Sequence, residues 1–390
     1  MQGQTLSVST GAVTCVFNAA EAGQMSYADG GTTLTIGGRA FSVSEIDSIT
    51  ASSTGSIGPA TVGVSYAGTT AHVTVSNDIL SHLTIITSGA DVSIVADAAL
   101  ADEVTYTLSG TSADGSFYMD GKYKATIVLD NLTLTNAHGG GAVTIDCGKR
   151  INVVVPDGTT TSLTDAAGGT QKACFFVNGH AELKGGGTLN VAGLSKHAYA
   201  SDEYTWLKPS FGTLNVTSSA NDGLHIEQYF RMDGGTVSVT SPVGDCIDVS
   251  ATTDATDELN GQVILNGGTL NLGVTSDDTK GLKADSLITI AGGTLNATVA
   301  GDGTKGISAG TDLVISQTTD TPTLVKMDVT GTTYHKDQAD ESKCRGIKVK
   351  GNFTFNGGTI NMNVTGKKAK GISVDGTYTY VSGTTNVLPE

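Results

Sequence analysis

The chain is poor in charged residues, aromatic residues and proline. Of its 390 residues, 15% are charged and 5% are aromatic, with 6 prolines and 1 tryptophan. The charges are unbalanced, since 38 Asp and Glu against 22 Lys and Arg give a net charge of −16. Binding to a nucleic-acid backbone requires clustered Lys and Arg. This balance therefore excludes nucleic acid as the main partner and favours cations or ligands that cations bridge.

Cysteines are few, odd in number and far apart. None of the five belongs to a Cys-x-x-Cys pair, which excludes the common zinc and redox motifs. Cys174 and Cys246 lie among apolar residues, where a buried free thiol is expected. A Cys147–Cys174 disulfide remains an alternative, because its geometry cannot be judged from spacing.

Long apolar runs are also absent. No stretch approaches the length of a transmembrane helix, so no direct membrane insertion is expected. Residues 1–4 carry neither the basic nor the apolar region of a signal peptide. Two alternatives follow: a cytosolic protein, or an exported one whose signal or lipid anchor is absent from this sequence.

Against these shortages stand 52 glycines and a strand motif, Gly-Gly-Thr-Leu-Asn, that recurs with small variations. A period near 25 residues with insertions is typical of a solenoid. The threonines of the six copies are spaced by 25, 23, 33, 25 and 65 residues, and they are Thr188, Thr213, Thr236, Thr269, Thr294 and Thr359.

Apolar residues around the motif alternate as they do in half-buried strands. The residues one and three places after the threonine are apolar, as in Leu270 and Leu272, and two more alternating segments precede the next copy. Three short strands per coil, each with one face inward, predict an all-β fold, a right-handed parallel β-helix. We assign it to residues 60–386, after a short N-terminal β segment at residues 1–50. Residues 317–345 break the period and are expected to form a loop or a side excursion.

Stacked coils place equivalent residues in rows, and one row consists of aspartates. These lie eight or nine residues after the threonines, with Asp248 beside them. Oxygen-rich clusters on turns suit Ca²⁺, which accepts about six to eight oxygens in loose geometry. The alternative is that aspartate before glycine is ordinary turn chemistry. The predicted calcium ligands are Asp222, Asp245, Asp248, Asp277, Asp278 and Asp302.

A second row faces outward from the second strand of each coil and includes His225, Asp248 and Lys283. Its simplest interpretation is a surface charge ladder of small energetic value. In the alternative, Lys283 removes a proton α to the carboxylate of a uronate held by Ca²⁺, which requires a lowered pKa and a positioned substrate. Three more lysines precede turn glycines and could take the same role: Lys280, Lys305 and Lys370.

A third row is aromatic. Trp206 and Tyr229 each lie seven residues before a threonine, so they are expected side by side on adjacent coils. An exposed apolar strip of this kind is a surface on which sugar rings stack. The alternative is local packing under the loop at residues 196–209. The predicted carbohydrate-binding residues are Trp206, Tyr229, His225 and Lys283.

A fourth row consists of asparagines. Side-chain amides stacked one coil apart can hydrogen-bond along the axis. We therefore interpret this row as structural, with ligand binding as the alternative. Its members are Asn190, Asn215, Asn271, Asn296 and Asn361.

Taken together, three features resemble the bacterial β-helix carbohydrate-binding domain family. They are the run Asn221-Asp222-Gly223-Leu224-His225-Ile226, the repeated Gly-Gly-Thr-Leu-Asn, and Ala173-Cys174-Phe175-Phe176-Val177. The resemblance covers about residues 60–385. It implies an exported protein that binds plant cell-wall polysaccharides such as cellulose and pectin, carries Ca²⁺, and is related in fold to family 9 pectate lyases.

The resemblance carries over to individual residues only at Asp222, Asp245 and Asp278, which match the turn motif. The last coil departs from the pattern because Lys367 and Lys368 stand where aspartates are expected. Any calcium is therefore expected in the middle coils. In addition, the stretch around residues 41–49 is similar to a leader found on surface proteins of gut Bacteroidetes.

The sequence thus predicts a secreted or cell-surface β-helix that binds polysaccharide without cleaving it, with Ca²⁺ as a structural or bridging ion. One alternative is a Ca²⁺-dependent, pectate-type polysaccharide lyase with Lys283 as its base. The other is a structural or adhesin rod whose ligand is a protein or another copy of the chain.

Overall fold

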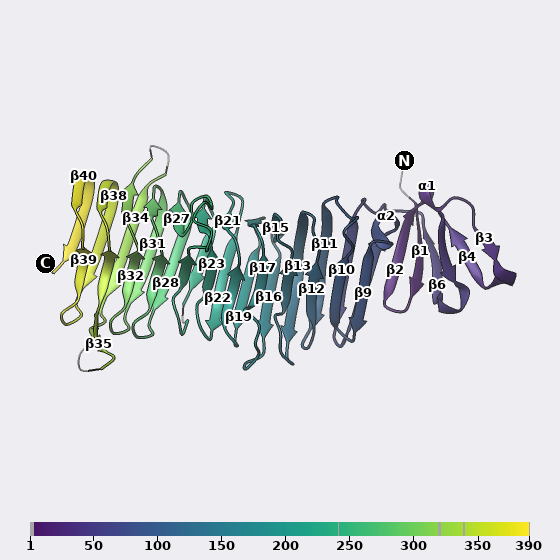
Figure 1. Cartoon of the computed structure of the whole chain (residues 1–390), viewed down its shortest axis with the longest axis horizontal. Helices are drawn as coiled ribbons and strands as arrows, with labels where there is room; N and C mark the ends of the chain where they lie inside the picture. Colours follow the sequence, from purple (N-terminus) through teal and green to yellow (C-terminus); the bar gives the residue numbers. More distant parts are fainter. Residues whose placement is uncertain (1–3, 241, 319–320, 338–339, 390) are drawn as a thin grey trace.

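The computed structural model describes residues 4–240, 242–318, 321–337 and 340–389 as an elongated, strand-rich molecule (Figure 1). The strands follow one another along the long axis, from the N-terminal residues at one end to the C-terminal residues at the other. The predicted all-β class is confirmed. Helices in the described part are short: α1 (Ala19–Ala22), α2 (Asn77–Leu80), η1 (Asp29–Gly31) and η2 (Val43–Glu45). None of them is long and apolar enough to cross a membrane.

One long sheet has twelve strands, which pair in parallel from its second strand onward. The strands are β9 (Leu83–Ser88), β10 (Asp91–Ala96), β12 (Ser116–Asp120), β14 (Val143–Asp146), β17 (Ala173–Asn178), β20 (His197–Ser201), β23 (Leu224–Glu227), β26 (Ile247–Ser250), β29 (Lys280–Ala284), β32 (Lys305–Ala309), β37 (Arg345–Val349) and β39 (Lys370–Val374). β9 and β10 are antiparallel. Neighbouring strands in this sheet come from successive repeats of the sequence.

The second long sheet has 23 strands and contains all copies of the Gly-Gly-Thr motif. The motif strands are β19 (Thr188–Gly193), β22 (Thr213–Ser219), β25 (Thr236–Val239), β28 (Thr269–Val274), β31 (Gly293–Val299) and β38 (Phe353–Val364). The first five pair in parallel, with each motif threonine beside the next. The prediction that successive copies stack in register is therefore confirmed for these strands.

The remaining strands of this sheet precede, follow or alternate with the motif strands. They are β1 (Thr5–Thr10), β2 (Val13–Asn18), β6 (Ser48–Ser52), β7 (Thr61–Ala67), β8 (Thr70–Ser76), β11 (Val104–Ser112), β13 (Ala125–Asn136), β15 (Ile151–Val154), β16 (Thr160–Asp165), β18 (Ala181–Lys184), β21 (Thr205–Leu207), β24 (Tyr229–Met232), β27 (Gln262–Leu265), β30 (Ile288–Ile290), β33 (Leu313–Ser316), β34 (Thr323–Val329) and β40 (Tyr378–Leu388). Most of them also pair in parallel with their counterparts in the next repeat.

The segment 317–345 is only partly an excursion. β34 lies in the long sheet between β31 and β38, in register with both, so the expectation of a loop is wrong for these residues. Leu324 and Lys326 occupy the places that threonine and asparagine hold in the motif, which hid this copy from the sequence pattern. The segment also contains a true excursion, the hairpin β35 (Thr333–His335) and β36 (Glu341–Lys343). Residues 319–320 and 338–339 lie outside the described residues.

The N-terminal strands pair mainly antiparallel. β1 pairs with both β2 and β6, and β2 continues the long sheet by pairing in parallel with β8. A separate three-stranded antiparallel sheet consists of β3 (Ser26–Ala28), β4 (Thr33–Ile36) and β5 (Arg39–Ser42). These strands enclose a small apolar core between Leu6 and Ile36.

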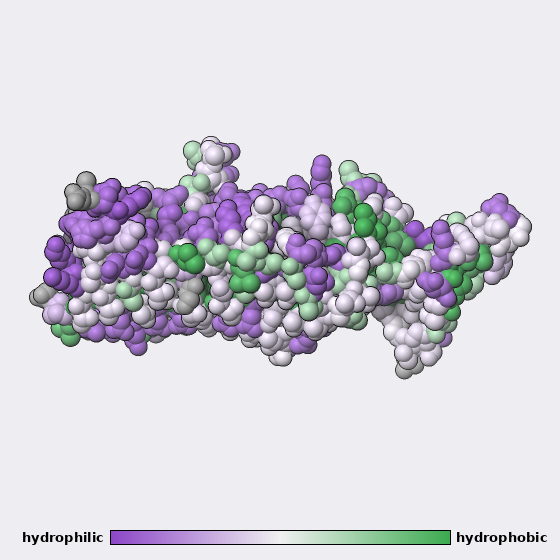
Figure 2. Space-filling view, turned by 90° about the horizontal axis from the view of Figure 1, so that it is seen from below, coloured by the Kyte–Doolittle hydropathy of each residue, from purple (hydrophilic) through white to green (hydrophobic). Residues whose placement is uncertain are grey.

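A larger apolar core extends from Ala60 to Val364. It forms because alternate residues of each strand point inward, as Leu282 and Ala284 of β29 do while Lys283 between them is partly exposed. Burial of this apolar surface is the main stabilising contribution. The outward positions are largely polar, and hydrophilic residues gather toward the C-terminal end of the face in Figure 2.

All five cysteines are buried and free. The prediction of buried thiols is confirmed, whereas the alternative Cys147–Cys174 disulfide is wrong. Strand register explains why: Val143 pairs with Phe175, so Cys174 lies beside the start of β14, whereas Cys147 follows its end.

Candidate functional site

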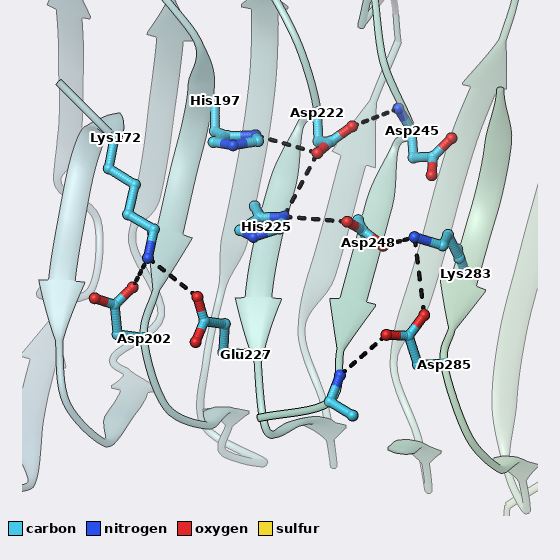
Figure 3. A network of polar contacts seen from close by, with 11 residues as sticks. Lys172, His197, Asp202, Asp222, His225, Glu227, Asp245, Asp248, Lys283 and Asp285 are labelled. Atoms are coloured by element: carbon cyan, nitrogen blue, oxygen red, sulfur yellow. Dashed lines mark hydrogen bonds and ion pairs between the residues drawn. The ribbon is translucent and has the colours of Figure 1, made fainter. Parts of the chain in front are cut away.

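The outward row predicted on the twelve-stranded sheet is present. His225 on β23, Asp248 on β26 and Lys283 on β29 pair with one another in register (Figure 3). His225 Nδ1 lies 3.1 Å from Asp248 Oδ2, and Lys283 Nζ lies 2.7 Å from Asp248 Oδ1. Asp248 is only 7% exposed, so the row is a partly buried network and not the surface ladder expected from sequence. Burial raises the pKa of Asp248, but the hydrogen bonds from His225 and Lys283 outweigh it and lower this pKa overall.

Lys283 lacks the electrostatic environment of a general base. Burial lowers its pKa, but the neighbouring Asp248 raises it more, so the net shift is upward. A general base at neutral pH requires the opposite shift. Of the three other lysines that could take this role, Lys305 has a pKa that burial lowers. Its ammonium group is nevertheless engaged with the Gly303 carbonyl at 2.6 Å and with Ser342 and Asp278.

A histidine that does not belong to any of the predicted rows, His197, adjoins this row. His197, at the start of β20, is 2% exposed, and its ring stacks on that of His225 with centroids 4.5 Å apart and planes 15° apart. Asp222 Oδ2 faces the Nδ1 atoms of both rings, 3.2 Å from that of His197 and 3.5 Å from that of His225 (Figure 3). Burial raises the pKa of Asp222, but both histidines and a backbone N–H lower it well below its usual range. The sequence contained a signal for this position, because His197 lies nine residues after Thr188 and so corresponds to the position that the aspartates occupy in later repeats.

The turn aspartates cap the backbone of the following repeat. Asp222 Oδ1 accepts the N–H of Asp245 at 2.8 Å, and Asp245 Oδ1 accepts the N–H of Lys280 at 2.7 Å. The same arrangement recurs where Asp277 accepts the N–H of Asp302 at 2.8 Å and where Asp302 accepts the N–H of Thr332 at 2.7 Å. This is the structural role that the turn-chemistry interpretation predicts.

The six predicted calcium ligands do not assemble a calcium cage. Among the described residues, ligand atoms of three His, Cys, Asp or Glu side chains converge only at His197, Asp222 and His225. No three of the predicted aspartates therefore meet at one point. Asp278 instead accepts a hydrogen bond from Ser342 at 2.6 Å. A calcium ion needs several convergent oxygens, and the carboxylates of the aspartate row do not by themselves supply three at one point.

The predicted pairing of Trp206 with Tyr229 is wrong. Trp206 on β21 pairs with Arg231 on β24, two residues further along the chain than Tyr229. The indole N–H donates to Asp233 at 2.7 Å, and the cationic groups of Lys208 and Arg231 lie over the ring. The ring is therefore already occupied by cation–π contacts.

Tyr229 belongs to a different aromatic row. Its ring stacks on Tyr204 with centroids 4.7 Å apart, and Tyr204 stacks on His180 at 4.5 Å. Tyr229 is 8% exposed. Rings stacked along the axis cover one another's faces, so neither aromatic row offers the open platform expected for sugar stacking.

The asparagine row forms the amide ladder predicted from sequence. Asn215 donates to Asn190 at 3.0 Å and Asn296 donates to Asn271 at 2.9 Å. Toward the C-terminus, Asn386 of β40 joins the row and donates to Asn361 at 2.8 Å. The ladder therefore holds successive strands together through their side chains.

Part of the ladder also lines a groove of about 840 Å³ on the outer face of the second sheet. The groove crosses β28, β31, β34, β38 and β40 and is lined by two parallel rows of outward-facing positions. The first row contains Asn271, Asn296, Lys326, Asn361 and Asn386. The second contains Gly273, Thr298, Asp328, Asn363 and Leu388. The repeat pattern predicts the ladder but not the groove, because β34 does not match the motif.

Lys326 is the one cationic residue among the described residues that line the groove. It lies between Asn296 and Asn361 in the first row, where its long side chain interrupts the amide ladder. Lys326 and the neighbouring Asp328 are both exposed and are the ionisable residues in the groove lining. The groove thus offers amides, an ammonium, a carboxylate and a hydroxyl at regular intervals.

The described part of the chain is thus an all-β scaffold with a polar groove on one face of the second long sheet. A model of the carbohydrate-binding domain-containing protein family matches residues 88–388, and the chain belongs to this family. The matched range contains the whole groove and the His197–Asp222–His225 cluster. The family resemblance inferred from the sequence is confirmed at this level.

Two further comparisons add little to this assignment. Among curated proteins, no sequence matches the chain significantly. A solved structure described as the polysaccharide lyase-like protein from C. thermocellum, gadolinium derivative, is similar at 18% identity with a TM-score of 0.48. The similarity covers 84% of this chain and 100% of that chain.

Proposed function

We propose that the protein binds a polysaccharide, without cleaving it, in the groove on the second long sheet. The observation that carries this proposal is the row of four asparagines and Lys326 across five strands, beside which Thr298, Asp328 and Asn363 form a second, shorter run of hydrogen-bonding side chains. Four strand spacings correspond to about 19 Å, a length that accommodates several sugar units. A polymer of similar units presents its hydroxyl groups repeatedly, as the groove presents its amides.

The chemistry of the lining supports recognition of hydroxyl groups. Each amide in the ladder has a second N–H or carbonyl lone pair that the neighbouring amide does not use. Lys326 and Thr298 add donors and Asp328 adds an acceptor, so the groove can match both roles of a sugar hydroxyl. A few placed polar groups of this kind orient a ligand in a binding site.

The same chemistry supports binding without cleavage. Glycoside hydrolysis uses a pair of carboxyl groups that flank the scissile bond, and Asp328 is the single carboxylate in the groove lining. Lys283, the base of the lyase alternative, lies on the other long sheet and has a raised pKa.

The proposal is tested by affinity electrophoresis in gels that contain one polysaccharide each, across neutral and acidic glycans. The variant N296A/N361A should lose most of its retardation in the gel that retards the unaltered protein. The matched control N190A/N215A removes two amides from the same ladder outside the groove and should bind normally. Equal binding by both variants would place the glycan elsewhere.

The same samples distinguish the alternatives. Ultraviolet absorption from unsaturated products, after incubation with polygalacturonate and Ca²⁺, would support the lyase. The absence of binding to every glycan would favour the structural or adhesin rod. Binding that disappears on chelation would support the predicted role of Ca²⁺ as a bridging ion.

Two finer features belong to the same proposal. We infer that the parallel strand pairs form a right-handed β-helix with three strands per coil, because equivalent strands of successive repeats lie side by side. A protein that binds cell-wall polysaccharide acts outside the cytoplasm, so we also infer secretion or cell-surface attachment. Fractionation of cells that make the protein tests whether it is secreted or attached to the cell surface.

A further inference from the structure

We propose that His197, Asp222 and His225 bind one transition-metal ion of the Zn²⁺ type. The three side chains come from β20, from the turn before β23 and from β23. Their ligand atoms all lie within 4.8 Å of one another. The site lies on the opposite long sheet from the groove, and it does not depend on the polysaccharide proposal.

The distances around Asp222 suit metal coordination. Two ligands about 2.1 Å from a tetrahedral ion are roughly 3.4 Å apart. Asp222 Oδ2 lies 3.2 Å from His197 Nδ1 and 3.5 Å from His225 Nδ1, which brackets this value. The carboxylate is also oriented, because its Oδ1 accepts the backbone N–H of Asp245 and leaves Oδ2 toward the histidines. Such second-sphere hydrogen bonds are typical of metal sites.

A buried nitrogen without a hydrogen bond points to an absent ligand. His197 is 2% exposed, and its Nδ1 makes no hydrogen bond with the described residues, although Asp222 is near. Buried polar atoms are nearly always hydrogen-bonded, and an exception needs a physical reason. A metal ion at Nδ1 would supply that reason, since it would coordinate this nitrogen together with Asp222 Oδ2, which lies 3.2 Å away without a hydrogen bond between them.

The ligand types select the metal. Two imidazole nitrogens and one carboxylate oxygen suit Zn²⁺, Co²⁺, Ni²⁺ or Cu²⁺, whereas Ca²⁺ prefers oxygen ligands alone. A water molecule would complete a four-coordinate site. Asp248 lies next to the site and also contacts Lys283 at 2.7 Å, so it would remain an ion-pair partner when His225 turns to the metal.

Binding requires a small movement of the rings. The two imidazoles are nearly parallel in the structure, and an ion must lie close to the plane of each ring that it coordinates. Rotation of one ring about its Cβ–Cγ bond would make the two nitrogen lone pairs converge. The ion would then connect neighbouring strands β20 and β23 and should raise the melting temperature of the protein.

The test uses the full chain, freed of metal by chelation and dialysis, and titrates it with Zn²⁺, Co²⁺ and Ca²⁺ by calorimetry. We expect one Zn²⁺ per chain, a visible Co²⁺ absorption band of tetrahedral intensity, and a rise in melting temperature with Zn²⁺ but not with Ca²⁺. The variants D222N and H225Q should each bind Zn²⁺ at least ten-fold more weakly. D222N retains an oxygen that can accept the Asp245 N–H.

His138 provides a matched control. It also lies between two carboxylates, 2.6 Å from Asp114 and 3.3 Å from Asp91, but it does not belong to a converging three-ligand cluster. H138Q should bind Zn²⁺ like the unaltered protein. Absence of Zn²⁺ binding by the folded protein would overturn the proposal. So would D222N and H225Q variants that bind Zn²⁺ as tightly as the unaltered protein does. If circular dichroism shows that either variant does not fold, the Co²⁺ spectrum of the unaltered chain decides. A band of tetrahedral intensity supports the site, whereas the weak band of octahedral Co²⁺ in water contradicts it.

Discussion

The guanidinium of Arg231 lies over the indole ring of Trp206, 4.2 Å from its centroid, on the neighbouring strand of the second long sheet. Asp233 fixes this pair, since it accepts the indole N–H at 2.7 Å and a hydrogen bond from Arg231 Nε at 3.0 Å. The single tryptophan of the chain is therefore a packing residue between two strands.

A Trp206→Phe substitution should weaken the fold but not the binding of polysaccharide. It removes a hydrogen bond to a carboxylate and weakens the cation–π contact, which together correspond to about 1–2 kcal/mol of the free energy of unfolding. Urea denaturation followed by circular dichroism measures the loss. Tyr27→Phe alters an exposed aromatic residue and should leave stability unchanged. A loss of glycan binding in W206F would instead support the prediction from sequence that Trp206 binds carbohydrate.

The cysteines should be unreactive while the protein is folded. Burial raises the pKa of Cys15 to about 11 and that of Cys246 to about 12, and it raises the pKa of the other three thiols as well. The thiolate is the reactive form, so a thiol reagent at pH 8 should label none of them. In denaturant all five should react. Fewer than five labelled thiols in denaturant would reveal a disulfide.

His138 should contribute stability only at low pH. Hydrogen bonding to Asp114 and the nearby charge of Asp91 raise its pKa above the ordinary value. A raised pKa in the folded state means that the contribution is complete below the unfolded pKa and disappears as pH rises through the folded pKa. Because the side chain is half exposed, H138Q should cost only about 0.5 kcal/mol at pH 5.5 and nothing at pH 9.

A double-mutant cycle with D114N isolates this pair. At pH 5.5 the combined variant should cost less than the two single variants added together, and 1 M salt should reduce the coupling. A coupling that persists unchanged at pH 9 would contradict the assignment to a charged histidine.

The all-β class and the parallel stacking of the motif strands could be predicted from the sequence because alternation and period are local properties. Leu282 and Ala284 alternate with the polar Lys283 in the sequence, and the same two residues are buried in the structure. The motif threonines pair with one another because the copies share the same strand pattern. Rows far from the threonine were less predictable, because turn lengths differ. Seven residues separate Trp206 from Thr213, but only five separate its true partner Arg231 from Thr236, so counting back from the threonine selected Tyr229 instead.

The candidate sites were predictable only in part. Counting forward found Asp222 and the outward row, but it did not indicate that Asp222 Oδ1 is used by the backbone of Asp245 while Oδ2 faces two histidines. That distinction depends on side-chain direction, which a repeat pattern does not contain. The groove was missed for another reason: Lys326 replaces an asparagine, so its strand did not match the motif.

Replacement of Lys326 by asparagine should stabilise the protein and alter the groove at the same time. The new amide would stand between Asn296 and Asn361, at the place where the ladder is interrupted, and could hydrogen-bond to both. Each added side-chain hydrogen bond contributes about 0.5–1.5 kcal/mol, reduced here by solvent exposure, so we expect a gain of roughly 1 kcal/mol in the free energy of unfolding. Lys326→Gln is the control, since it removes the charge but places its amide too far out for the ladder. If the ammonium of Lys326 binds the glycan, K326N and K326Q should both bind less tightly, while only K326N should be more stable in urea. Equal stability of the two variants would show that the ladder does not tolerate completion at this strand.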